Sequence, residues 1–197
     1  MHPKLMLNLG LNVADYQINV CEGEGAPHYY WTLDLPPLEP LKNIAKRHLQ
    51  TQSILQPHTE YHNTLRFKLS PGPDPPYDEQ VHKLGPQKLT LQHLYVTQSG
   101  NAVCSVLQPD AVQQVNRMPN PHVSVARNND TEWKDLSRVL TQVERDTYEK
   151  TEVTHEGWLQ GRRTGCMRYT LGWVVTTHPA THMQDSIDRH MQEDSES

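Results

Sequence analysis

The chain has 197 residues, a formal net charge of −5 and a hydrophobic share of 35%. This length predicts one domain, or two small lobes that share a cleft. A protein that grips long nucleic acid needs many Lys and Arg contacts to phosphates, so the acidic balance argues against a duplex-binding protein. A small nucleotide needs only a few donors and is compatible with this charge.

The cysteines and the hydropathy pattern indicate the cellular compartment in which we expect the protein. Cys21, Cys104 and Cys166 are odd in number and widely spaced, which predicts neither a disulfide framework nor a zinc pattern. No apolar run reaches the roughly 18 residues of a transmembrane helix, and the first residues lack the charged start and long apolar core of a signal peptide. We therefore expect a cytoplasmic protein in a reducing compartment.

The first half of the chain predicts a strand, a helix and a second strand. Residues 28–35 are rich in aromatic and β-branched side chains and end at two prolines, which is typical of a strand. Residues 38–50 repeat apolar side chains at helical spacing, and 61–69 form the next strand. The proline-rich segment 70–76 is expected to be a loop. Residues 1–27 are an N-terminal extension, which could add an edge strand or be a leader or polyprotein remnant.

The second half predicts further strands and two helices. Strands at 88–97 and 101–107 flank Gln98-Ser99-Gly100, a hairpin by spacing and composition. The later expected elements are a helix at 109–118, a strand at 122–127, a helix from Asp130 or Thr131 to Arg145, and strands at 151–159 and 166–177 around a turn at 160–162. Residues 178–197 are expected to be a polar C-terminal tail.

Two stretches of the chain form an approximate internal repeat. The strand at 28–35, the helix at 38–50 and the strand from 61 correspond to the strand, helix and strand that begin at 101. Two such units can face each other across a cleft, and each would contribute one histidine to that cleft.

Each unit ends in a strand that carries a His-x-Thr/Ser motif, His62-Asn63-Thr64 and His122-Val123-Ser124. Residues i and i+2 of a strand lie on the same side, so each imidazole sits beside a hydroxyl. One histidine could act as general base and the other as general acid, while the hydroxyls Thr64 and Ser124 stabilise a pentacoordinate phosphorus. With 12 histidines in the chain, one or two copies are expected by chance, so the placement of the motifs carries the prediction.

These segments resemble the LigT-like two-histidine (2H) phosphoesterase superfamily. Residues 30–37, Tyr-Trp-Thr-Leu-Asp-Leu-Pro-Pro, resemble its opening strand before a helix. The strands His62-Asn63-Thr64-Leu65 and Pro121-His122-Val123-Ser124-Val125 are similar to its paired motif strands, and the hairpin 88–107 precedes the second motif as in that family. The resemblance covers residues 28–175, and a viral or retroelement-encoded member is one possibility.

The resemblance implies a fold and an activity. The expected fold is α+β and bilobal, with two pseudo-symmetric lobes of antiparallel strands and outer helices around a central cleft, over residues 28–177. Members act without a metal on 2′,3′-cyclic phosphates, 2′-5′ linkages or cyclic dinucleotides, and some viral members remove antiviral second messengers.

Four side chains are candidates to bind the substrate: Arg66, Tyr61, Tyr169 and Trp173. Arg66 lies four residues after His62, which would put it on the same face of a regular strand and within reach of a phosphate. The aromatic side chains could border the cleft and stack a base. For Tyr169, the resemblance implies a position that lines the pocket.

Two further histidine pairs were weighed as metal ligands. His58 and His62 form His-x-Glu-x-His, but this is not the zinc-protease order, and the two positions lie two pleats apart in a strand. His178 and His182 could share a helix face, yet a third ligand is not evident. We therefore expect no metal site and no cofactor.

The sequence thus predicts a metal-independent phosphodiesterase acting on a small 2′-5′-linked nucleotide, a cyclic dinucleotide or a nucleotide cyclic phosphate. Its expected partner is a small nucleotide or short oligonucleotide, with no long duplex nucleic acid and no membrane, and we expect a monomer. Two alternatives stay open: a non-catalytic nucleotide-binding module, and a structural fragment of a viral or retroelement polyprotein. Neither the substrate nor the division of acid and base roles between the histidines follows from the sequence.

Overall fold

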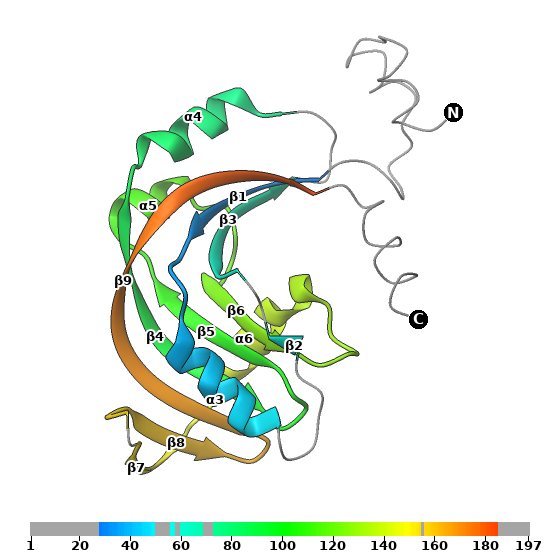
Figure 1. Cartoon of the computed structure of the whole chain (residues 1–197), viewed down its shortest axis with the longest axis vertical. Coiled ribbons are helices and arrows are strands. Elements are labelled where there is room, and N and C mark those ends of the chain that lie inside the picture. Colours follow the sequence, from blue (N-terminus) through cyan, green and yellow to red (C-terminus); the bar gives the residue numbers. More distant parts are fainter. Residues whose placement is uncertain (1–27, 50–55, 58–59, 69–72, 155, 185–197) are drawn as a thin grey trace.

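The computed structural model describes residues 28–184 apart from 50–55, 58–59, 69–72 and 155 (Figure 1). The strands are β1 (His28–Asp34), β2 (Gln56–Pro57), β3 (His62–Lys68), β4 (Gln87–Thr97), β5 (Ala102–Leu107), β6 (His122–Arg127), β7 (Glu149–Val153), β8 (Leu159–Arg163) and β9 (Cys166–Gln184). The helices are α3 (Glu39–Leu49), α4 (Pro75–Lys83), α5 (Asp110–Val115) and α6 (Leu136–Val143), with a 3-10 turn η1 at Trp133–Asp135. The expected α+β class is confirmed.

All nine strands belong to one antiparallel sheet in the order β1-β3-β6-β5-β4-β9-β8-β7, with β2 paired to β6. The first part of β9 pairs with β4 and its last residues pair with β1. Figure 1 shows β9 as one long curved strand that runs along β4 and then along β1. Six of the described strands therefore close into a ring in the order β1-β3-β6-β5-β4-β9, and two separate pseudo-symmetric lobes are not shown.

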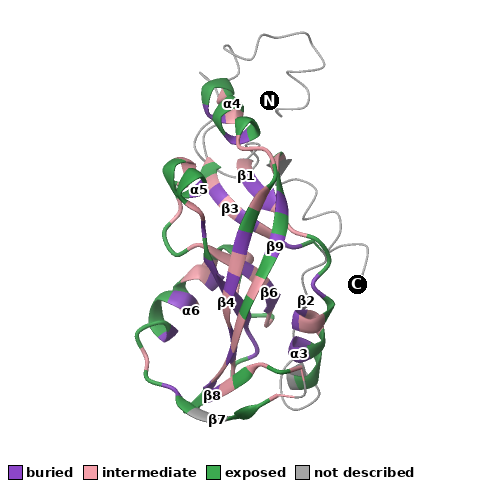
Figure 2. Cartoon of the chain, turned by 90° about the vertical axis from the view of Figure 1, so that its left-hand side faces the viewer, coloured by how far each residue is buried: buried purple, intermediate pink, exposed green. Residues whose placement is uncertain are grey.

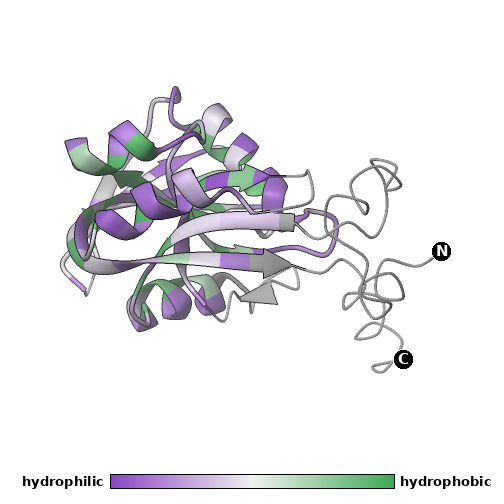
Figure 3. Ribbon diagram, turned by 90° about the horizontal axis from the view of Figure 1, so that it is seen from above, coloured by the Kyte–Doolittle hydropathy of each residue, from purple (hydrophilic) through white to green (hydrophobic). Residues whose placement is uncertain are grey.

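The sheet has a hydrophobic core on each face. The larger core takes side chains from α3, α4 and α5, and the smaller core takes Leu140 and Val143 from α6. Neighbouring residues on β5 show the division, because Cys104 belongs to the larger core and Val103 to the smaller one. Figure 2 shows buried positions along the strands and exposed ones on the outer turns of the helices, and Figure 3 shows hydrophilic and hydrophobic positions alternating along those helices.

Several elements differ from the sequence-based expectation. The strand expected at 151–159 is β7, which ends at Val153, and a turn with Gly157 at a φ of +85° separates it from β8. Helix α4 begins at Pro75, inside the stretch expected to be loop, because proline is tolerated in a first helical turn and Asp74 caps the helix by accepting a hydrogen bond from the Tyr77 N–H at 3.4 Å. The turn expected at 160–162 is part of β8, and the chain turns instead at Gly165, whose φ is +79°. Strand β9 continues to Gln184, seven residues beyond the expected end of the domain.

Cys104 and Cys166 are buried free thiols, and Cys21 lies outside the described residues. Within the described part of the chain, the helices are too short and too polar for any of them to cross a membrane.

Candidate active site

The two motif strands are neighbours in the sheet. β3 and β6 run antiparallel, and their register pairs Asn63 with Val123. The residues on either side of that pair therefore oppose each other, with His62 across from Ser124 and Thr64 across from His122. Directly opposed Cβ atoms in such a pair are about 4.5–5.5 Å apart, so the register gathers both imidazoles and both hydroxyls into one patch.

This patch, called the motif cluster below, consists of His62, Thr64, His122 and Ser124. All four side chains are partly exposed, whereas Asn63 and Val123 between them are fully buried. Alternation along each strand explains the difference, because the intervening residues face the larger core. The structure therefore brings together the four side chains that the sequence predicted as catalytic.

The His122 ring is held by a backbone carbonyl. Its Nδ1 lies 2.9 Å from the carbonyl oxygen of Asn120. A carbonyl can only accept, so Nδ1 carries the proton in this contact and Nε2 of the neutral ring keeps its lone pair. Burial lowers the pKa of His122 from its ordinary value of 6.5, and the Asn120 carbonyl opposes this shift. The net lowering favours a neutral ring at pH 7.

The segment before the second motif is anchored to α6. Asn120 adopts a positive φ of 51°, a conformation in which Asn is tolerated better than most residues. Its Nδ2 donates a hydrogen bond of 2.6 Å to Oγ1 of Thr141 on α6. Helix α6 therefore helps to place the carbonyl that orients His122.

Strands β1 and β9 add polar side chains next to His62. Asp34 on β1 is the register partner of both His62 and His178. The Tyr30 ring lies 5.9 Å from the His62 ring and stacks on the His182 ring at 5.0 Å, measured between centroids. His182 Nε2 is 3.4 Å from Asp34 Oδ1.

Sequence reasoning did not single out Tyr30 or Asp34 as site residues. Both belong to the segment on which the family resemblance rests, and alternation places the two residues on one face of β1. That this face adjoins His62 follows only from the pairing of β1 with β3, which no local signal in the sequence reports.

Arg66 does not share the face of His62, so that expectation is wrong. The ladder between β1 and β3 is irregular between Trp31 and Thr32, where Trp31 pairs with Arg66 but Thr32 pairs with Thr64. This bulge inserts one residue and reverses the alternation beyond it. The Arg66 guanidinium lies over the rings of Trp31 and Tyr77, at 5.4 and 4.7 Å from their centroids. It also pairs with Asp74 at 2.7 Å.

The three aromatic candidates belong to the larger core rather than to the motif cluster. Tyr61 is 6% exposed and Tyr169 is 7% exposed, and Trp173 packs against the same core from β9. Tyr61 directly precedes His62, so alternation turns it to the opposite face. Burial raises the pKa of both tyrosine hydroxyls, with Glu39 adding to the effect at Tyr61.

The structure describes one of the two histidine pairs that were weighed as metal ligands, His178 and His182. His58 lies outside the described residues. His178 and His182 lie on a strand, not on a helix, and His178 is exposed. In the part of the chain that the structure describes, no three His, Cys, Asp or Glu side chains are grouped so that they could hold a metal ion.

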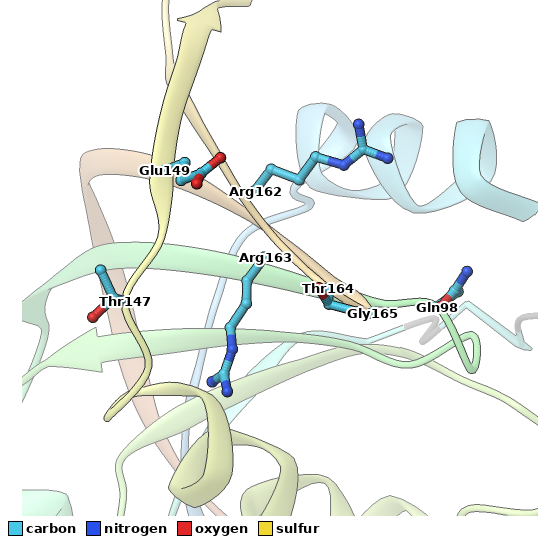
Figure 4. A pocket seen from close by; sticks show the side chains of 7 residues that line it. All are labelled: Gln98, Thr147, Glu149, Arg162, Arg163, Thr164 and Gly165. Carbon is cyan, nitrogen blue, oxygen red and sulfur yellow. The ribbon is translucent and has the colours of Figure 1, made fainter.

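The cavity in Figure 4 lies away from the motif cluster. It has a volume of about 500 Å³ and is lined by Gln98, Thr147, Glu149, Arg162, Arg163, Thr164 and Gly165. One of its two arginines, Arg163, forms an ion pair with Asp146. None of the lining residues belongs to the motif cluster, so the cavity takes no part in the chemistry considered below.

No family model matches the chain, and no curated protein matches it in sequence. Among solved structures, a fungal RNA kinase is similar in structure, with a TM-score of 0.46 and 8% sequence identity. The match covers 86% of this chain and 48% of the kinase chain, so this chain spans about half the length of that protein. At this degree of similarity, function has to be argued from the chain's own residues.

Proposed function

We propose that this chain is a member of the 2H phosphoesterase superfamily that cleaves or opens a phosphodiester of a small nucleotide by acid–base catalysis. The observation that carries the proposal is the register of β3 and β6, which opposes His62 to Ser124 and Thr64 to His122 on one accessible face. Two imidazoles and two hydroxyls in one patch are the groups that this chemistry requires.

The surroundings of His122 support a division of roles between the two histidines. His122 is the general base, because its Nδ1 proton is committed to the Asn120 carbonyl and burial lowers its pKa. Its Nε2 takes the proton of the attacking hydroxyl or water. His62 is then the general acid and gives its proton to the leaving oxygen, while Thr64 and Ser124 donate hydrogen bonds to the phosphoryl oxygens.

The proposed substrate is a 2′-5′-linked nucleotide, a cyclic dinucleotide or a nucleotide cyclic phosphate. The motif cluster occupies two residues on each of two adjacent strands, which matches one phosphodiester rather than a long backbone. The net charge of −5 likewise favours a ligand with few phosphates. Where a ribose hydroxyl adjoins the bond, that hydroxyl is the nucleophile and a cyclic phosphate is the product; otherwise water attacks.

The test is a substrate panel assayed in EDTA. The panel contains 2′-5′ oligoadenylate, 2′,3′-cyclic mononucleotides, mixed-linkage cyclic dinucleotides and 3′-5′ RNA. We expect turnover of at least one small nucleotide, and a loss of roughly 10²–10⁴-fold in kcat for His62→Ala and for His122→Ala. His82→Ala is the matched control, because His82 is an exposed histidine on α4, a helix that contributes to the larger core.

The same panel distinguishes the alternatives. Binding of a nucleotide without turnover, unchanged in both histidine variants, would make the chain a non-catalytic binding module. Neither binding nor turnover of any member of the panel would overturn the proposal and leave a structural role.

A further inference from the structure

A chain of three amides, two of them buried, lies beneath the motif cluster on the side of the larger core. Asn63, which is 0% exposed, donates a hydrogen bond of 2.9 Å from Nδ2 to the carbonyl oxygen of His122. Gln108, which is 4% exposed, donates from Nε2 to Asn63 Oδ1 at 2.7 Å. Gln113 in turn donates from Nε2 to the carbonyl oxygen of Gln108 at 2.8 Å.

The first of these bonds joins the two motif strands where their backbone pairing is short. β3 and β6 share the single register pair of Asn63 with Val123, whereas β5 pairs with β6 at four positions. The side chain of Asn63 therefore adds a cross-strand bond at the first residue of the second motif. It connects the residue that follows His62 to the backbone of His122 itself.

Two buried amides are costly if their only role is to fill space. Burying an amide removes its hydrogen bonds to water, and an apolar side chain avoids that desolvation cost. The neighbouring buried positions Leu33, Leu65 and Val123 are apolar. In the described structure Gln108 Oε1 is also buried without a hydrogen-bond partner, which adds to the desolvation cost of this pair.

We propose that Asn63 and Gln108 form a positioning pair that sets the separation and orientation of the His62 and His122 rings. Asn63 ties the two strands together through the His122 carbonyl, and Gln108 holds the Asn63 amide in the orientation in which its Nδ2 can donate. Neither residue touches the substrate. The inference rests on the proposed function for its catalytic consequence, but the geometry that it predicts can be measured without turnover.

Two graded variants test the pair. Asn63→Leu removes both hydrogen bonds and keeps the branching and number of side-chain heavy atoms. We expect kcat to fall about 10²-fold with a much smaller change in KM, because a shift of about 1 Å between reacting groups has an effect of this size. Gln108→Met removes only the supporting bond, so its loss in kcat should be smaller. If Asn63→Leu does not fold, Gln108→Met still tests the pair, and wild-type kcat in that variant would overturn the inference.

Thr177→Val is the matched control for the loss of a buried hydrogen bond. Thr177 is 0% exposed and its Oγ1 donates to the Gln87 carbonyl at 3.0 Å, which joins β9 to β4 and leaves the bonds between β3 and β6 unchanged. The isosteric change should lower the unfolding temperature and leave kcat unchanged. If Asn63→Leu lowers the unfolding temperature but keeps the kcat of Thr177→Val, the amides are merely structural and the inference is overturned.

A second readout separates this inference from the proposed function. The ring protons of His62 and His122 can be followed by NMR during a pH titration of the wild type and of Asn63→Leu, with the exposed His82 as internal reference. We expect altered shifts and an altered titration midpoint for His122. If the wild type turns over no substrate, the proposed function fails, and the NMR comparison alone decides this inference. Identical His62 and His122 signals in the two proteins would overturn it.

Discussion

At the scale of single residues, two opposing effects determine the protonation state of His122. Burial disfavours the charged ring, and the Asn120 carbonyl favours a protonated Nδ1. The net pKa lies below the ordinary 6.5, so His122 is neutral at pH 7 and its Nε2 can accept a proton. This is the physical reason for assigning it the role of base.

The pH dependence of turnover checks this assignment. A base must be neutral to act, so kcat/KM should rise with pH through the pKa of His122 in the free enzyme. Because burial lowers that pKa, the midpoint of this acidic limb should lie below 6.5. The measurement is kcat/KM from about pH 4.5 to 8.5 at constant ionic strength. A midpoint at or above 6.5 would contradict the role given to His122.

Arg66 illustrates how a residue at a predicted site can have a structural role. Its guanidinium packs on Trp31 and Tyr77 and pairs with Asp74, which joins β3 to α4. Arg66→Lys keeps the charge but loses the planar contact with the rings, so the free energy of unfolding should fall by ~0.5–1 kcal/mol. Chemical denaturation measures this change, and kcat should stay at the wild-type value. A tenfold loss in kcat would show that Arg66 reaches the substrate after all.

At the scale of elements, α6 supports the second motif through one hydrogen bond. Thr141→Val removes the acceptor of Asn120 Nδ2 and frees a residue held at a φ of 51°. The net cost in unfolding free energy should be about 0.5–1.5 kcal/mol. We also expect a several-fold lower kcat, because the carbonyl that orients His122 loses its support. Thermal unfolding and turnover measure the two effects.

Ser137→Ala, one turn earlier on α6, is the control for this change. Thr141 Oγ1 donates to the Ser137 backbone carbonyl, so the substitution at Ser137 leaves both bonds of Thr141 in place. The Ser137 variant should keep the wild-type kcat. Equal losses of kcat in the two variants would point to a general effect of helix stability rather than to the Asn120 contact.

The elements also show which parts of the secondary structure can be predicted from local sequence patterns. Strands β1, β3, β4, β5 and β6 lie where alternation and β-branched residues predicted them, because these patterns depend on neighbours in the chain. Helix α4 and strand β8 were missed for the opposite reason. The prolines at the start of α4 are typical of a loop, and Gly161 in β8 is typical of a turn. In the folded chain Gly161 instead lies where a side chain would meet the Tyr148 Cβ at 3.1 Å. This crowding comes from Tyr148, the residue that directly precedes β7, and not from a neighbour in β8.

At the scale of the whole molecule, β9 connects the ring of strands. Its residues 166–177 pair with β4, and its residues 178–184 pair with β1. A chain that ends after residue 177 would lose the ladder with β1, the strand that places Asp34 and Tyr30 beside His62. We expect a clearly lower unfolding temperature and a loss of turnover in this truncated protein.

A chain that ends after residue 184 is the control for this truncation. It keeps all of β9 and removes only residues 185–197. It should unfold at the temperature of the full chain and keep its kcat. If the chain ending at 177 were as stable and as active as the chain ending at 184, the closure of the ring through β1 and β9 would not matter for the site.

The sequence by itself determined which residues form the motif strands, and that His62 and Thr64, like His122 and Ser124, point to the same side. These properties are local, since alternation depends only on the backbone of one strand. The tertiary structure alone decided that β3 lies next to β6, that Asn63 pairs with Val123, and that a bulge turns Arg66 to the other face. Pairing between distant segments depends on how both faces of the sheet are buried, so the motif cluster and the amides beneath it exist only in the folded chain.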